Sequence, residues 1–88
     1  MPVLSMFYGI IIRMFKEDKE KHHKPHFHAI YAENEIVIAL DGEILEGSMP
    51  KSKIKLIEAW MELHKEELEA NWRLLIESGE FYKIEPLR

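Results

Sequence analysis

The alternation of apolar and polar positions divides the chain into a β-rich first half and a helical second half. Residues 7–15 read F-Y-G-I-I-I-R-M-F, a run of aromatic and β-branched side chains whose length and composition predict a strand. Residues 26–32 and 35–40 predict two further strands. They are joined at Glu33 and Asn34, and Asn34 suits a tight turn because asparagine tolerates a positive φ. These strands predict an antiparallel meander.

After Gly47 the apolar spacing changes from two to between three and four, which predicts helix. Ser48 can cap its start, and Pro50 lies in the first turn, where its missing N–H is not needed. The apolar stripe consists of Ile54, Ile57, Met61, His64, Leu68, Trp72 and Leu75. One unbroken helix over residues 49–78 would be about 45 Å long. Since a compact domain of this size measures only ~25 to 30 Å across, we expect two helices, or one bent near residues 64–67.

The predicted fold class is therefore α+β: a small antiparallel sheet of three to four strands within residues 5–46, packed against the helical region 49–78. We expect residues 82–84 to return as an edge strand that Pro86 ends. A chain of 88 residues has enough apolar material for one core and not for two. Residues 1–88 are therefore predicted to form a single domain.

Composition narrows the function classes. The chain has no cysteine, which excludes disulfides, thiolate metal sites and a cysteine nucleophile. Its apolar runs are too short to cross a bilayer, and its start lacks the pattern of a secretory signal, so we expect a cytoplasmic protein without a membrane partner. The formal net charge of −4 argues against coating nucleic acid by bulk charge, although residues 1–30 carry five basic and three acidic side chains. A local RNA site stays open.

The block H-H-K-P-H-F-H-A at residues 22–29 is the strongest chemical signal. On a strand, His26 and His28 project to the same face about 6.6 to 7 Å apart along the chain, which suits a shared metal ion such as zinc. His22, His23 or Asp18 could complete such a site. The alternative is a pair of polar histidines that hydrogen-bond to neighbouring strands or to solvent, with no cofactor, and this is the commoner outcome for two histidines.

A histidine pair can also serve as acid and base without metal, because imidazole titrates near neutral pH. With Arg13 on a phosphate group, His26 and His28 would form the catalytic set of a metal-independent ribonuclease. The alternative for Arg13 is an ion pair with an acidic side chain such as Glu46.

Two further features indicate binding. Lys51, Lys53 and Lys55 crowd the start of the predicted helix, where the helix dipole favours acidic side chains, so an anion or an acidic partner would suit this position. A solvated lysine face is the alternative. Trp72 can face a partner, because large aromatic side chains concentrate at binding hot spots.

Five segments occur in the order known from one family. They are F-Y-G-I-I-I-R-M at 7–14, P-H-F-H-A at 25–29, L-E-G at 45–47, W-M-E-L-H-K-E-E-L-E-A-N-W at 60–72 and K-I-E-P-L at 83–87. The chain resembles the bacterial and archaeal family called domain of unknown function 4160. The family motif falls on Arg13, Asp18, Pro25, His26, His28, Trp60, His64 and Trp72. Lys24 stands where many members have a proline, and the preceding loop is longer, so either His22 or His23 can correspond to the family's first histidine.

The resemblance brings no established activity. It implies a gene context like that of toxin–antitoxin pairs, often beside a small protein of the domain of unknown function 2442 family. We therefore expect a small intracellular interaction protein, one component of a two-protein module, whose contact surface includes His22, His23, the three lysines and Trp72. The alternatives are a ribonuclease-like toxin and a histidine-cluster metal protein. The sequence does not reveal whether the chain forms a homo-oligomer.

Overall fold

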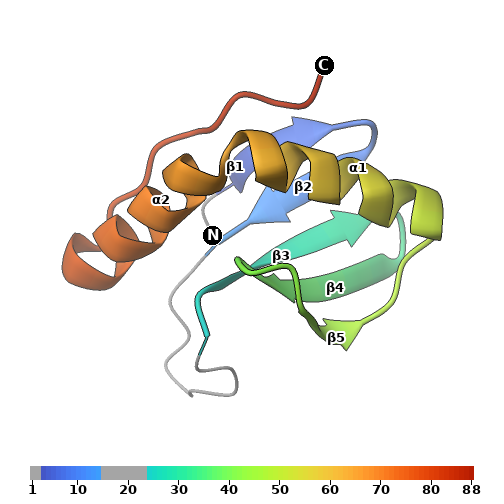
Figure 1. The fold of residues 1–88 in the computed structure, drawn as a ribbon, viewed down its shortest axis with the longest axis horizontal. Helices are drawn as coiled ribbons and strands as arrows, with labels where there is room; N and C mark the ends of the chain where they lie inside the picture. The colour runs from blue at the N-terminus through green and yellow to red at the C-terminus, as the bar shows by residue number, and fades with distance from the viewer. Residues whose placement is uncertain (1–2, 15–23) are drawn as a thin grey trace.

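The first half of the chain folds into a β-meander, and two helices follow it (Figure 1). The structure is a computed structural model, and it describes residues 3–14 and 24–88. Its elements are β1 (Val3–Phe7), β2 (Ile10–Arg13), β3 (His26–Tyr31), β4 (Asn34–Ala39), β5 (Ile44–Gly47), α1 (Lys51–Leu63) and α2 (Lys65–Ser78). Neighbouring strands are antiparallel, in the order β1-β2-β3-β4-β5. The predicted α+β class is confirmed, with five strands in the described residues instead of three to four.

The additional strand arises from a turn inside the segment that was expected to be one strand. Tyr8 and Gly9 both have positive φ, 49° and 80°, and Phe7 pairs with Ile10 directly across this turn. Two consecutive positive φ values are typical of the tight hairpin turns that match strand twist, and glycine adopts them without steric cost. The prediction of one strand over residues 7–15 was therefore wrong, because the turn at Tyr8 and Gly9 divides this segment between β1 and β2.

The β3–β4 hairpin turns one residue earlier than predicted. Tyr31 pairs with Asn34, so Ala32 and Glu33 form the two-residue loop. The positive φ belongs to Ala32, at 53°, and Asn34 lies in β4. The expected turn at Glu33 and Asn34 is corrected accordingly.

The helices pack on one face of the sheet around Trp60 of α1. Its ring centre lies 5.3 Å from that of Phe7 and 5.9 Å from that of Phe27. Figure 1 shows α1 passing over the strands, whereas α2 continues past their end. The largest fully buried apolar side chains are Trp60, Phe27, Leu4, Ile10, Ile12, Met14, Ile36, Ile38, Ile57 and Leu68.

A break at His64 separates the two helices, as the length argument predicted. His64 has φ −123° and ψ 25°, outside helical geometry, and its backbone N–H donates to the carbonyl oxygens of Trp60 and Met61. Its ring Nδ1 lies 2.6 Å from a carboxylate oxygen of Glu67 in the first turn of α2. The described residues span 34 × 26 × 21 Å, which one straight helix of 30 residues would exceed.

The C-terminal segment does not form the predicted edge strand, although it runs back to β1. The backbone N–H of Ile84 donates to the carbonyl oxygen of Leu4 at 2.8 Å, and the indole N–H of Trp60 donates to the carbonyl oxygen of Glu85 at 2.8 Å. Asn71, fully buried in α2, accepts the N–H of Tyr82 at 2.9 Å. These bonds satisfy scattered groups and do not form a ladder, so residues 82–84 stay irregular.

Candidate functional site

The pairing register places Arg13 and His28 side by side on the sheet face opposite α1. Arg13 pairs with His28, His28 pairs with Val37, and Val37 pairs with Glu46. Directly paired residues in antiparallel strands project to the same face. We call this side the histidine face, defined by Arg13, His26, His28, Glu35 and Glu46. It is the side away from Phe27 and Trp60.

His26 is almost fully enclosed at the start of β3, with 2% of its surface exposed. Its Nδ1 lies 2.7 Å from the carbonyl oxygen of Lys24. Its ring centre is 5.6 Å from that of His28 and 5.2 Å from that of Trp72 in α2. The ring is therefore oriented by a backbone hydrogen bond and held by aromatic contacts on two sides.

His28 is held by a carboxylate that the sequence analysis did not single out. Its Nδ1 lies 2.9 Å from Oε2 of Glu35 in β4, and the Glu35 side chain is 55% exposed. Glu35 pairs with Ile30, two residues along β3 from His28, so the contact is diagonal across the hairpin. The His28 ring is thus buried, whereas the carboxylate that it contacts is exposed to solvent.

These contacts assign the ring proton of both histidines. A carbonyl oxygen only accepts hydrogen bonds, so Nδ1 of His26 carries the proton that it donates. A carboxylate also accepts, so Nδ1 of His28 carries a proton as well. In the neutral form, each ring then has its lone pair on Nε2.

Arg13 is partly exposed and lies in the same row as His28. The suggested ion-pair partner, Glu46, is in that row too, but His28 and Val37 of the two intervening strands lie between them. Their Cα atoms are three strand spacings apart, about 14 Å. The structure therefore brings Arg13 to the histidine pair.

The lysines at the start of α1 are not part of this site. Lys53 lies over the ring of Tyr31, 4.7 Å from its centre, and its Nζ is 3.4 Å from the carbonyl oxygen of Tyr8. Tyr31 is at the far end of β3 from His26, about 17 Å away along the strand. Lys51 and Lys55 are exposed on the same helix start. The lysines and His26 therefore lie at opposite ends of β3, whereas a contact surface that joins the lysines to His22 and His23 stays a prediction, because those two histidines lie outside the described residues.

His22, His23 and Asp18 lie outside the described residues. Across residues 3–14 and 24–88, no group of three or more histidine, cysteine, aspartate or glutamate side chains is placed to hold a metal ion.

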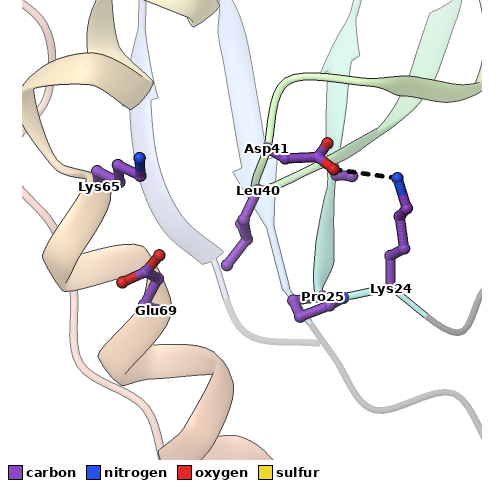
Figure 2. Close-up of a pocket in the computed structure, with 7 residues that line it drawn as sticks. Lys24, Pro25, Leu40, Asp41, Lys65 and Glu69 are labelled. Atoms are coloured by element: carbon purple, nitrogen blue, oxygen red, sulfur yellow. Dashed lines mark hydrogen bonds and ion pairs between the residues drawn. The ribbon is translucent and has the colours of Figure 1, made fainter.

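An apolar groove lies between α2 and the ends of β3 and β4. It consists of two adjoining pockets of about 360 and 350 Å³ that share Pro25, Leu40 and Glu69. Trp72 and Ile76 of α2 line the first pocket, and Ile76 is 43% exposed. Figure 2 shows Pro25 and Leu40 across from the α2 side chains that line the second. We call this surface the α2 groove.

The rim of the α2 groove carries charges of alternating sign. Lys65, Glu69, Arg73 and Glu77 follow each other at intervals of four residues, and all four line the groove. Residues four apart are neighbours on a helix surface. Within the part of the chain that the structure describes, none of the four forms a hydrogen bond or an ion pair through its side chain.

Across the groove, Lys24 bridges the turn that ends β4. Its Nζ contacts a carboxylate oxygen of Asp41, at 3.0 Å, and one of Glu43 (Figure 2 shows the Asp41 contact). The side-chain bond to Glu43 and then that to Asp41 raise the pKa of Lys24. The backbone N–H of Glu43, followed by Lys24, lowers the pKa of Asp41. These contacts of Lys24 with Asp41 and Glu43, which we call the Lys24 bracket, join the start of β3 to the turn that follows β4.

Comparison with known proteins identifies the chain at family level. A sequence model of the family described as domain of unknown function 4160 matches residues 9–73. The chain belongs to this family. Among curated proteins and solved structures, none matches the chain. No helix in the described residues has the length and apolar content needed to cross a membrane.

The segment that matches domain of unknown function 4160 includes the histidine face and part of the α2 groove, whose residues Ile76 and Glu77 lie beyond it. Arg13, His26, His28 and Glu35 lie within residues 9–73, as do Pro25, Leu40 and Trp72. β1 and the C-terminal segment that contacts it lie outside the matched range.

Proposed function

We propose that this member of domain of unknown function 4160 is a small cytoplasmic protein-binding module, one half of a toxin–antitoxin-like pair. In this proposal the α2 groove receives an amphipathic helix of a small partner protein, of the domain of unknown function 2442 family in the resembled gene context. The observation that carries the proposal is an apolar groove bordered by four charges of alternating sign that are unpaired among residues 3–14 and 24–88.

The floor of the groove suits apolar anchor side chains. Pro25 and Leu40 offer rigid and branched surface on one side, and Trp72 and Ile76 on the other. Short helices commonly bind such grooves by inserting side chains spaced at one helical turn. An exposed isoleucine beside a half-buried tryptophan is a suitable hot spot for this mode of binding.

The rim favours a helical partner of defined register. A partner helix with acidic and basic side chains also spaced by four could match Lys65, Glu69, Arg73 and Glu77 in turn, as flanking charges do between paired helices. A partner shifted by one turn would place like charges together. The rim therefore supports specificity more than affinity.

Co-expression with the product of the neighbouring gene tests this proposal. We expect one co-eluting peak in size-exclusion chromatography, and a loss of at least about tenfold in affinity for Ile76→Glu, because a charge would enter the apolar floor. Leu63→Glu is the matched control, since Leu63 is 69% exposed and does not line the groove. Two separate peaks for the wild-type pair, or equal losses for both variants, would contradict the proposal.

A second candidate function follows from the position of Arg13 opposite His28. In a metal-independent ribonuclease, one imidazole would remove a proton from a ribose hydroxyl, the other would protonate the leaving oxygen, and Arg13 would stabilise the phosphate charge. The test compares RNA integrity after induction of wild type and of Arg13→Gln with His28→Gln. We expect cleavage that persists in chelator for wild type and is lost in the variant; intact RNA in both removes this candidate.

A further inference from the structure

We propose that two copies of this chain associate through the sheet face that α1 does not cover, with Arg13 of each copy against Glu35 of the other. The inference is separate from partner binding in the α2 groove. It rests on a row of apolar side chains on this face and on the positions of the two charges beside that row.

The apolar row crosses the first three strands. Met6 pairs with Ile11, and Ile11 pairs with Ile30, so the three side chains project to the same face. Met6 is 62% exposed, and Ile11 and Ile30 are partly exposed. The solvent face of an antiparallel sheet commonly carries polar side chains at such positions. Three adjoining apolar side chains, which we call the open row, therefore indicate a surface that another molecule covers.

Two opposite charges lie beside the open row, at the diagonal corners of a block of three strands. Glu35 continues the row into β4, because it pairs with Ile30. Arg13 lies two residues further along β2 than Ile11 and pairs with His28. The strand spacing and the rise per residue place the Cα atoms of Arg13 and Glu35 about 12 Å apart.

Arg13 lacks a counter-charge. Within residues 3–14 and 24–88 its side chain forms no ion pair, and its Nε is covered without a hydrogen-bond acceptor. A partly buried cation without an acceptor costs free energy. The Glu35 side chain is 55% exposed, and only its Oε2 contacts His28. A carboxylate from a second molecule would satisfy Arg13, and Glu35 of a second copy is accessible for this contact.

The diagonal arrangement of the two charges is self-complementary. A twofold axis in the plane of the interface, midway between Arg13 and Glu35 and perpendicular to the line that joins them, exchanges the two corners between copies. Each guanidinium then meets a carboxylate. With the same strand spacing, this axis passes between Ile11 and Ile30, so it brings Ile30 of one copy over Ile11 of the other. A contact of one patch with itself is what a twofold homodimer requires.

Sedimentation equilibrium of the tag-free chain tests the association. We expect a monomer–dimer equilibrium for wild type. Arg13→Glu and Glu35→Arg should each raise the dissociation constant at least about tenfold, because each variant places like charges together at both ends of the interface. Circular dichroism checks that both variants fold.

An exchange of charges between copies locates the contact. An equimolar mixture of the Arg13→Glu and Glu35→Arg chains should form a heterodimer, because both ion pairs are then present with one sign reversed in each chain. The double variant, which carries both changes in one chain, should regain self-association. A variant that had merely lost its fold would not recover in the mixture.

An uncharged substitution keeps the test independent of Arg13. Met6→Ser removes exposed apolar surface from the open row and should raise the dissociation constant at least about fivefold. Leu63→Ser is the matched control, since Leu63 is 69% exposed and belongs to α1. It should associate like the wild type.

Three results would overturn the proposal: a wild type that stays monomeric up to about 1 mM, equal behaviour of Met6→Ser and Leu63→Ser, or a mixture of the two charge variants that stays monomeric. A monomeric wild type that still co-elutes with the product of the neighbouring gene would overturn the self-association and leave the groove proposal intact.

Discussion

The carboxylate of Glu35 accepts the Nδ1 proton of His28 across the β3–β4 hairpin, at 2.9 Å. This bond fixes one tautomer of a buried ring through a side chain that is itself half exposed. A half-exposed side chain thus determines the tautomer of His28. Substitution of Glu35 should therefore change the His28 ring without opening a cavity in the core.

NMR of the ring nitrogens tests that relationship. In a buffer alkaline enough to leave imidazole neutral, both His26 and His28 should carry the proton on Nδ1. Glu35→Ala should move His28 toward a mixture of tautomers and leave His26 unchanged, because His26 donates to the carbonyl oxygen of Lys24. Glu33→Ala, in the adjacent turn, is the control and should change neither ring. An unaltered His28 in Glu35→Ala would contradict the assignment.

Gly47 should tolerate no side chain. Its φ is +84°, and a Cβ there would lie 2.1 Å from the carbonyl oxygen of Glu35. Gly47→Ala combines left-handed strain with overlap against backbone, so we expect a loss of roughly 2 to 5 kcal/mol in the free energy of unfolding. Gly42→Ala is the matched control, because its φ is +100° with no atom within 4 Å. It should cost only about 1 to 2 kcal/mol, and equal losses in urea denaturation would refute the overlap.

Asn71 should hold the C-terminal segment in place. Its Oδ1 accepts the N–H of Tyr82, and its Nδ2 donates to the carbonyl oxygen of Glu67 at 3.2 Å. Asn71→Ala removes both bonds at a fully buried position, so the free energy of unfolding should fall by about 1 to 3 kcal/mol. Hydrogen exchange at Tyr82 should accelerate as well. Ser78→Ala, on the exposed end of α2, should stay within about 0.5 kcal/mol of wild type.

The Lys24 bracket predicts that the stability of the fold falls at both acidic and strongly alkaline pH. The lowered pKa of Asp41 means that its contribution to stability is present above the pKa of an unfolded aspartate and is lost as the pH falls through the folded value. The raised pKa of Lys24 means the reverse: its contribution is present below the unfolded lysine value and is lost as the pH rises through the folded value.

NMR titration of the Asp41 carboxyl checks the acidic side. In wild type its pKa should lie below the ordinary aspartate value, and Lys24→Gln should raise it only part of the way back. The reason is that the backbone N–H of Glu43, the larger cause, remains. A complete return in Lys24→Gln would show that the lysine is the dominant cause.

The histidine pair and the helix break could be predicted because each follows from a local rule. Alternation on a strand places His26 and His28 on one face, and the length of the apolar stripe requires a break, found at His64. The alternation of side chains along β2 alone does not determine whether Arg13 shares that face. The answer depended on the β2–β3 register, which pairs Arg13 with His28.

Glu35 was missed because register depends on the turn. A turn at Glu33 and Asn34 would pair His28 with Ala39, whereas the observed turn at Ala32 and Glu33 pairs it with Val37. Moving the turn by one residue keeps the face and slides the partner by two, so Glu35 comes within reach only in the observed register. The residue types did not indicate the observed turn, because Ala32 has a positive φ there and alanine rarely adopts one.

The α2 groove could not be predicted either, since it forms between strand-end residues and α2 residues that the sequence separates by more than twenty positions. Trp72 was singled out as an aromatic side chain, but its neighbours Pro25 and Leu40 come from the ends of β3 and β4. Only the break at His64 directs α2 past these strand ends, and that direction is a tertiary property.

The contact between Leu4 and Ile84 has a consequence for synthesis on the ribosome. β1 is made first, yet the backbone bond between Leu4 and Ile84 joins residues that are 80 positions apart. The indole bond of Trp60 also needs Glu85, which is made 25 positions later. Contacts of such sequence separation form late because a long loop must close first. A nascent chain that already contains β1 to β5 must therefore wait for residues 82–85 to emerge from the exit tunnel before the C-terminal segment can bind β1.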